Sequence, residues 1–160
     1  MTKDEMMEYQ DDYELEEIAS EEEEDIAMNM SEEEILQALI TCGDRVKTKT
    51  YLVKEKGIPI TIKGLTEIEF AQARKEATQK KKVRGQWVTD VNDATLSAAI
   101  VSRATISPNF NDRKLLDAFR VSSGTEYLKR QFYSGTLNNI CDKVLTLSGF
   151  DDGLEEVKNS

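Results

Sequence analysis

The segment NDATLSAAIVSRATISPNFNDRKLLDAF, residues 92–119, decides the fold because it joins two apolar runs through a polar corner. Its first half is apolar around nearly the whole circumference of a predicted helix, which is typical of a helix in the middle of a domain. Pro108 disfavours helical geometry at the residue before it and is expected to end this helix. Asn111 is predicted to cap the next helix, with Phe110 and Leu115 in contact across the cap. The segment therefore predicts a corner between helices.

Two further helices are predicted upstream from capping signals, in which a Ser or Thr is followed three residues later by Glu. The first signal is at Ser31 and predicts a short helix that runs to about Thr41. The second is at Thr66 and predicts a helix over residues 67–80. The lysines at Lys80–Lys82 would then interact favourably with the negative end of the helix dipole.

A β-hairpin is predicted between these two helices, at about residues 46–63. Three isoleucines alternate along its second strand and share one face: Ile58, Ile60 and Ile62. Lys56 and Gly57 form the expected turn, and Pro59 indicates an edge strand or a site without a ladder hydrogen bond. A later segment, residues 81–92, is interpreted either as a second hairpin with Arg84-Gly85 at its turn or as a loop.

Two more helices complete the predicted fold. Ser123 with Glu126 forms a further capping signal, and the last helix covers about residues 134–148, with Gly149 as its C-cap. We therefore predict an α+β, predominantly α-helical fold, in which a small N-terminal β-hairpin is followed by four or five short helices. The predicted boundaries are a disordered acidic arm over 1–30, a single domain over 31–150 and a flexible tail over 151–160.

Charge divides the sequence into two parts of opposite sign. Residues 1–45 contain 17 acidic and 2 basic side chains, for a net charge of −15, whereas residues 46–160 contain 14 acidic and 19 basic side chains, for a net charge of +5. The charge of the whole chain, −10, disfavours binding to nucleic acid and to anionic membranes. The basic stretch over residues 74–87 leaves three interpretations open: a solvated helix end, a nucleic-acid patch, or a surface covered by the acidic arm.

Composition points away from catalysis. The sequence contains no histidine, which excludes His-based triads and His-ligated metal sites, and its two cysteines, Cys42 and Cys141, are far apart. Its carboxylates lie in solvated runs, and its glycines form no phosphate-binding loop. We expect a cytosolic protein that is not an enzyme, with no cofactor, no metal site and no catalytic residue.

The sequence resembles the XkdN-like phage tail assembly chaperones. The resemblance rests on three segments: KEKGIPITIKGLTEIEF (54–70), LSAAIVSRATISPNFNDRKLLDAF (96–119) and YSGTLNNICDKVLTLSGFD (133–151). It implies a chaperone that binds the tape measure protein, keeps it soluble and helps recruit tail tube subunits during tail morphogenesis. It also implies action in the host bacterial cytoplasm and absence from the mature virion. Two further binding partners are considered, the tail tube protein and other copies of this chain.

The last predicted helix provides the candidate partner-binding surface. Its apolar face, with two phenylalanines as neighbours, gives the contact residues Leu137, Ile140, Val144, Leu145, Phe110 and Phe119. An apolar face of this kind can bind an amphipathic helix of a partner, although it can equally form the core of the domain. The alternative function is an acidic regulatory or nucleic-acid-mimicking protein that binds a basic partner through residues 1–25.

Overall fold

The computed structural model describes residues 28–43, 45–150 and 154. The chain divides into two compact units, Met1–Arg45 and Val46–Ser160. The described part of the first unit contains helix α2 (Glu32–Cys42), which begins as predicted with the Ser31 hydroxyl accepting a hydrogen bond from the Glu34 N–H at 3.2 Å. No residue of α2 is buried. Most of the predicted acidic arm and of the C-terminal tail lies outside the described residues, so the predicted domain boundaries stay predictions.

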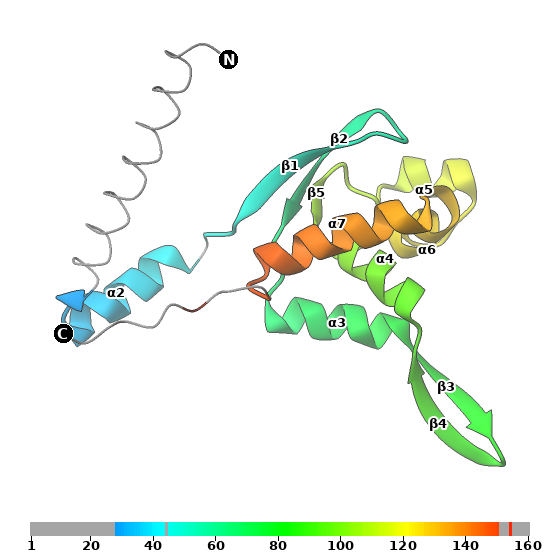
Figure 1. Ribbon diagram of the computed structural model, residues 1–160, viewed down its shortest axis with the longest axis horizontal. Coiled ribbons are helices and arrows are strands. Elements are labelled where there is room, and N and C mark those ends of the chain that lie inside the picture. Colours follow the sequence, from blue (N-terminus) through cyan, green and yellow to red (C-terminus); the bar gives the residue numbers. More distant parts are fainter. Residues whose placement is uncertain (1–27, 44, 151–153, 155–160) are drawn as a thin grey trace, which may run out of the picture. The chain divides into compact units, whose positions relative to one another are not determined.

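A three-stranded antiparallel sheet organises the main unit, which we define as residues 46–160. Strands β1 (Thr48–Val53) and β2 (Ile58–Lys63) form the predicted hairpin, and β5 (Thr105–Ser107) pairs with the other side of β2 (Figure 1). Ile60 and Ile62 are fully buried and Ile58 packs beside them, which confirms the predicted face.

The position of Pro59 corrects one of the two alternatives given for it. Strand β2 is the central strand of the sheet, so the edge-strand interpretation is wrong. However, β5 pairs only with Thr61 and Ile62, and Pro59 therefore lies beyond the short region in which β2 has neighbours on both sides. A proline is tolerated there because it removes no bond from the β2–β5 pairing.

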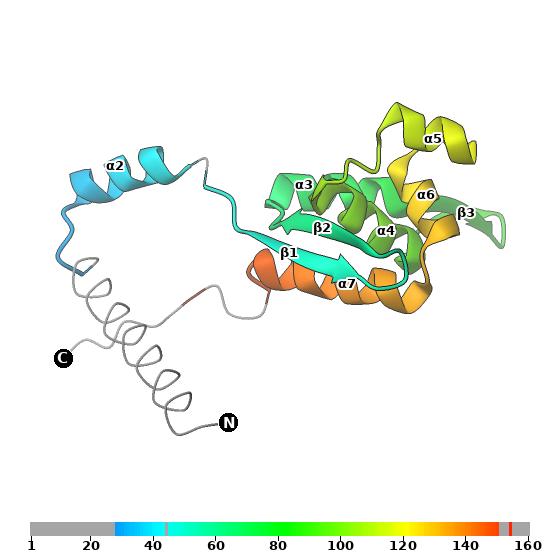
Figure 2. The same ribbon diagram turned by 90° about the horizontal axis from the view of Figure 1, so that it is seen from above.

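The core of the main unit surrounds helix α4 (Asp93–Ala104), as the apolar circumference of this segment predicted. Helix α4 contacts α3 (Glu67–Ala77), α6 (Gly124–Gln131) and α7 (Ser134–Leu147), and it also contacts β2 and β5. Three buried alanines on α4 allow this close approach because they place little bulk between the helices: Ala98, Ala99 and Ala104. Figure 2 shows α4 beneath the sheet, with α7 along one side.

A second hairpin, β3 (Thr78–Val83) with β4 (Gln86–Val91), settles the ambiguity over residues 81–92. Its turn is at Arg84 and Gly85, which both have positive φ. The prediction of a helix over 67–80 is wrong at its end, because α3 stops at Ala77 and the lysines Lys80–Lys82 belong to β3. Pairing with β4 provides hydrogen-bond partners for the backbone N–H and C=O groups that would otherwise have bonded within a longer helix. These lysines therefore do not lie at the end of a helix.

The corner after α4 differs from the prediction in two respects. Helix α4 ends at Ala104 and the chain forms β5 before it reaches Pro108, so the proline does not end the helix. The cap of α5 (Arg113–Phe119) is Asp112 rather than Asn111. The Asn111 side chain instead donates to the Ser102 hydroxyl at 3.2 Å and accepts from the Gly124 N–H at 2.9 Å.

The last two helices largely follow their capping signals. Ser123 caps α6, but the Glu126 carboxylate accepts hydrogen bonds from the backbone and hydroxyl of Ser122, so the reciprocal half of the capping box is displaced by one residue. Helix α7 is followed by Gly149 at φ +88°, as predicted. The Gly149 and Phe150 N–H groups donate back to the helix carbonyls, as in a Schellman motif. The chain thus has a mixed α+β fold.

Candidate partner-binding groove

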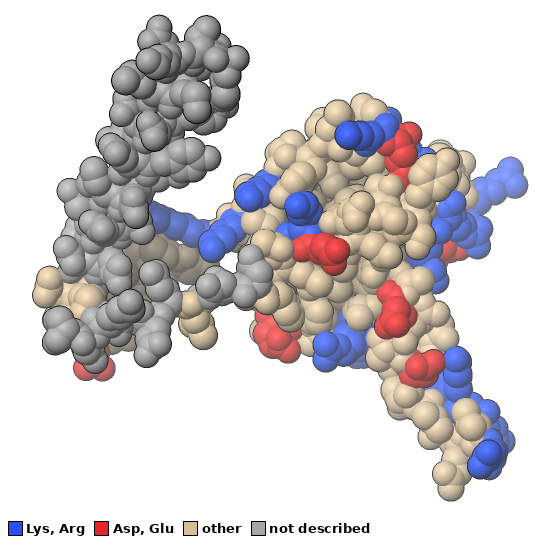
Figure 3. Space-filling model, viewed as in Figure 1, with Lys and Arg blue, Asp and Glu red and all other residues tan. Residues whose placement is uncertain are grey.

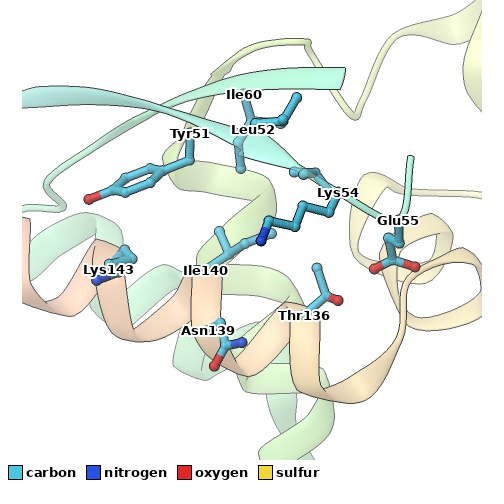
Figure 4. A pocket seen from close by; sticks show the side chains of 10 residues that line it. Tyr51, Leu52, Lys54, Glu55, Ile60, Thr136, Asn139, Ile140 and Lys143 are labelled. Carbon is cyan, nitrogen blue, oxygen red and sulfur yellow. The ribbon is translucent and has the colours of Figure 1, made fainter. Parts of the chain in front are cut away.

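A hollow of about 330 Å³ lies between β1 and α7 in the main unit (Figure 4). We name it the β1–α7 groove, and it is lined by Tyr51, Leu52, Val53, Lys54, Glu55, Ile60, Thr136, Asn139, Ile140 and Lys143. Three of these residues are buried and form its apolar bottom: Val53, Ile60 and Ile140. Its volume is near the lower end of the 300–1,000 Å³ or so of small-molecule pockets, so it suits side chains of a partner better than a large cofactor.

The turn after β1 holds the N-terminal end of α7 and thereby shapes this groove. Helix α7 has no side-chain cap of its own at Tyr133. Instead, the Glu55 carboxylate accepts the Tyr133 N–H at 3.3 Å, from a position 78 residues earlier in the sequence. The neighbouring Lys56 ammonium lies 5.5 Å from the centre of the Phe132 ring. These contacts fix the spacing between the hairpin and the first turn of α7.

The rim of the groove is polar and carries a net positive charge, because Lys54 and Lys143 line it together with one acidic residue, Glu55. The Lys143 ammonium lies 5.9 Å from the centre of the Tyr51 ring, and Figure 4 shows Lys54 extending between β1 and α7. Thr136 and Asn139 lie on the same side of α7 as Lys143. An apolar bottom with cationic edges is suited to an amphipathic segment that carries acidic side chains beside its apolar ones.

The six predicted contact residues separate into two groups. Leu137 and Val144 are buried on the inward face of α7, and Leu145 packs partly buried against the same core. Ile140 is also buried but lines the groove. Their role in binding stays a prediction, whereas their packing in the core is observed.

The two predicted phenylalanines lie elsewhere, around Tyr127 of α6. Phe110 is buried with its ring centre 6.0 Å from that of Tyr127, and Phe119 is 42% exposed with its ring centre 5.1 Å from the same tyrosine. Neither residue lines the β1–α7 groove. The structure therefore places Phe110 and Phe119 against the same tyrosine, away from the groove.

Sequence reasoning missed the β1 side of the groove. Tyr51 belongs to β1 and Lys54 to the turn after it, in a hairpin that is predicted only from its β-branched residues and its bounding turn residues. The alternation along β1 contained a usable signal, because Tyr51 and Val53 are two residues apart and share a face. On α7, Thr136, Asn139 and Lys143 follow the helical period and share a face. Because these residues are polar, a search for apolar helix faces does not detect them.

The described residues were also compared with the requirements of a metal site, of a reactive thiol or hydroxyl, and of a membrane-spanning helix. Within the described ranges, no three His, Cys, Asp or Glu side chains are grouped in a way that could hold a metal ion. Burial raises the pKa of the Cys141 thiol and of the Tyr127 hydroxyl, which keeps both groups protonated. None of the helices described is both long and apolar enough to cross a membrane.

Comparison with known proteins identifies relatives over most of the chain. The XkdN protein of the phage-like element PBSX of Bacillus subtilis (strain 168) is 30% identical over 118 residues, which cover 71% of this chain and 80% of that protein. The YqbN protein of the same organism is 28% identical over 116 residues, covering 71% and 78%. The crystal structure of YqbN shares the fold, with a TM-score of 0.52 and 20% identity over 71% of this chain and 96% of that one.

The family assignment rests on a match to most of the chain. Residues 28–159 match the sequence model of the phage XkdN-like tail assembly chaperone proteins, TAC. The match includes both hairpins, the central helix and the groove between β1 and α7. It confirms the resemblance drawn from residues 54–70, 96–119 and 133–151. The chain belongs to the phage XkdN-like tail assembly chaperone family.

Proposed function

We propose that this chain binds apolar helical segments of a phage tape measure protein, keeps them soluble, and helps recruit tail tube subunits before it leaves the finished tail. Membership of a tail assembly chaperone family supports an assembly role with protein partners. We propose that the protein acts in the host bacterial cytoplasm and is absent from the mature virion.

The observation that carries the proposal is the β1–α7 groove. A helix that lies along α7 can insert apolar side chains, spaced three or four residues apart, against Tyr51, Val53 and Ile140. Lys54 and Lys143 at the rim can then contact acidic side chains of the same helix. Reversible binding is expected, because a hollow of this size buries only a few side chains of the partner.

The predicted contact residues take different parts in this proposal. Ile140 contacts the partner at the bottom of the groove, whereas Leu137, Val144 and Leu145 hold α7 against the core. Phe110 and Phe119 support the packing of α6 through Tyr127. Substitution of the buried members would unfold the protein, so the exposed groove residues provide the better test.

Co-expression with the tape measure protein of the same phage or prophage tests the proposal. The variant Asn139→Glu places a negative charge in the groove at an exposed position. We expect it to capture about tenfold less tape measure protein, a loss of about 1.4 kcal/mol, because the new carboxylate repels acidic side chains of the partner helix and can pair with Lys143, which then no longer contacts them. Co-purification on a tag of the chaperone measures the captured amount.

The matched control is Asn138→Glu, which makes the same change one residue earlier, at an exposed position outside the groove. This control should retain the tape measure protein, and both variants should have the melting temperature of the wild type. Equal capture by Asn139→Glu and the wild type would remove the groove from the binding surface. Failure of the wild type to capture any tape measure protein would contradict the proposed function itself.

A further inference from the structure

The β3–β4 hairpin exposes an aromatic side chain that the proposed function does not use. All of β4 and all of β3 except Thr78 are exposed, and Trp87 is 71% exposed. Val83 and Val88 are exposed beside it. A two-stranded hairpin is marginally stable by itself, and its large apolar side chains gain stability only when another surface covers them.

This hairpin also carries unneutralised positive charge. Residues 78–91 contain four basic side chains and one acidic one, for a net charge of +3. Among the described residues, the hairpin has one ion pair, between Lys81 and Asp90 at 3.0 Å. The Lys82 ammonium lies 5.9 Å from the centre of the Trp87 ring. Figure 3 shows the basic side chains gathered near the tip of the hairpin.

One segment of the sequence has the complementary composition. Residues 4–25 contain 13 acidic side chains and no basic one, with Tyr9 and Tyr13 placed among the acidic positions. These residues lie outside the described part of the chain. Their carboxylates can pair with the lysines of β3, and their aromatic rings can contact Trp87.

We propose that the acidic segment, residues 4–25, is an intramolecular ligand of the β3–β4 hairpin. The proposal rests on charge, on the exposure of Trp87 and on chain length. Exposed ion pairs are individually weak, so a segment free in solution would bind poorly. The 22 residues between the acidic segment and β1, of which helix α2 takes 11, make the contact intramolecular, so that contacts too weak to hold two separate chains together can be populated.

The covered hairpin has a clear consequence for the behaviour of the protein. A basic surface with an exposed tryptophan binds polyanions such as single-stranded nucleic acid, because phosphates pair with lysine and bases stack on aromatic rings. The tethered acidic segment competes with such ligands for the hairpin and lowers their binding. Salt weakens the binding of the acidic segment to the hairpin, since the contacts between exposed charges are screened.

Trp87 is the only tryptophan of the sequence, so its fluorescence reports on the hairpin in the full-length chain. We expect quenching by acrylamide, which is uncharged, to rise about twofold between 20 mM and 500 mM NaCl as screening releases the acidic segment. The charge-neutralised variant Glu21→Gln/Glu22→Gln/Glu23→Gln/Glu24→Gln should already show higher quenching at 20 mM NaCl. Quenching that is independent of salt in the wild type would overturn the proposal.

A second pair of variants tests the hairpin side. Lys80→Glu/Lys82→Glu should lose most of the salt response, because like charges then repel the acidic segment. The control Arg113→Glu/Lys114→Glu makes the same change in charge at exposed positions of α5 and should keep the wild-type response. An equal loss in both double variants would show that net charge alone causes the effect, and would refute docking on the hairpin.

Two further measurements identify the occupant. The salt response should not change with protein concentration, whereas a response that grows with concentration would assign the contact to a second copy and overturn the intramolecular proposal. A fluorescent single-stranded oligonucleotide should bind the charge-neutralised variant at least about threefold more tightly than the wild type. Equal affinities would show that the acidic segment does not cover the hairpin. None of these results depends on the tape measure protein.

Discussion

The two β-hairpins of this chain share a local geometry and differ in everything that surrounds them. Each pairs two six-residue antiparallel strands, and each turn contains a glycine with positive φ, Gly57 in the first and Gly85 in the second. The first hairpin belongs to a three-stranded sheet and buries isoleucines against α4 and α7. The second is exposed along nearly its whole length.

The comparison shows that a turn and cross-strand pairing can form a hairpin without making it part of a core. In β2, every second residue is an isoleucine, so one whole face is apolar. In β3, the corresponding stretch is Lys80–Lys82, and neither face can be buried at low cost. The ion pairs differ in the same way: the side chains of Lys63 and Glu69 are 27% and 29% exposed, and those of Lys81 and Asp90 are 59% and 53% exposed.

The largest difference between the hairpins should appear when a β-branched core residue is shortened. Ile62→Ala removes a fully buried side chain from β2 and should lower the free energy of unfolding by about 2–5 kcal/mol. The matched change Val88→Ala, at an exposed position of β4, should cost less than about 0.5 kcal/mol. Urea denaturation measures both values. Similar losses would mean that the second hairpin is buried against another surface.

A smaller effect is expected from the ion pairs. The Glu69 carboxylate binds the Lys63 ammonium at 2.8 Å and also accepts from the backbone and hydroxyl of Thr66. Glu69→Gln should therefore cost about 1 kcal/mol near pH 7, whereas Asp90→Asn should cost almost nothing. Thermal or urea unfolding of the two variants at one pH provides the comparison.

The pH dependence of the Glu69 contribution has a definite sign. The hydrogen bond from Lys63 is the main cause that holds the pKa of Glu69 below its ordinary value of 4.5. A carboxyl whose pKa is lower in the folded state stabilises the protein above its unfolded pKa and loses that contribution as the pH falls through the folded pKa. The difference between wild type and Glu69→Gln should thus be constant near pH 7 and shrink below about pH 4.5. A difference that grows on acidification would contradict this assignment.

The smallest effect should come from removing the second hairpin altogether. The Asn92 N–H donates to the Ala77 carbonyl at 2.9 Å, so the chain enters and leaves the hairpin at adjacent points. Replacing residues 79–90 by an Asn-Gly turn should shift the melting temperature by less than about 4 °C, which is the shift that 1 kcal/mol produces in a domain of this size. A calorimetric scan measures it, and a larger loss would show that the hairpin stabilises the fold.

Much of the fold could be predicted from local signals. Ser31 and Thr66 begin their helices as expected, because a cap needs only the side chain and the next few backbone N–H groups. The isoleucine alternation in β2 and the continuous apolar run in α4 each identify a buried element from one segment alone. These elements are decided by neighbours in sequence, and for that reason the sequence predicts them.

The errors arose where distant residues compete for the same groups. Asn111 was predicted to cap α5, but its side chain binds Ser102 and Gly124, and Asp112 takes the cap. The β1–α7 groove was missed because six of its lining residues belong to the first hairpin and four to a helix more than 70 residues later. No periodicity within one segment contains that information.

The sequence by itself determined the positions of most helices and of the first hairpin, the opposite charges of its two parts, and its family. Those features depend on side chains that act within a few residues or on composition. The tertiary structure decided which apolar residues are core and which line the β1–α7 groove, and it separated the buried hairpin from the exposed one. Burial is a property of the assembled elements, so it becomes definite only when helices and strands from distant parts of the chain pack together.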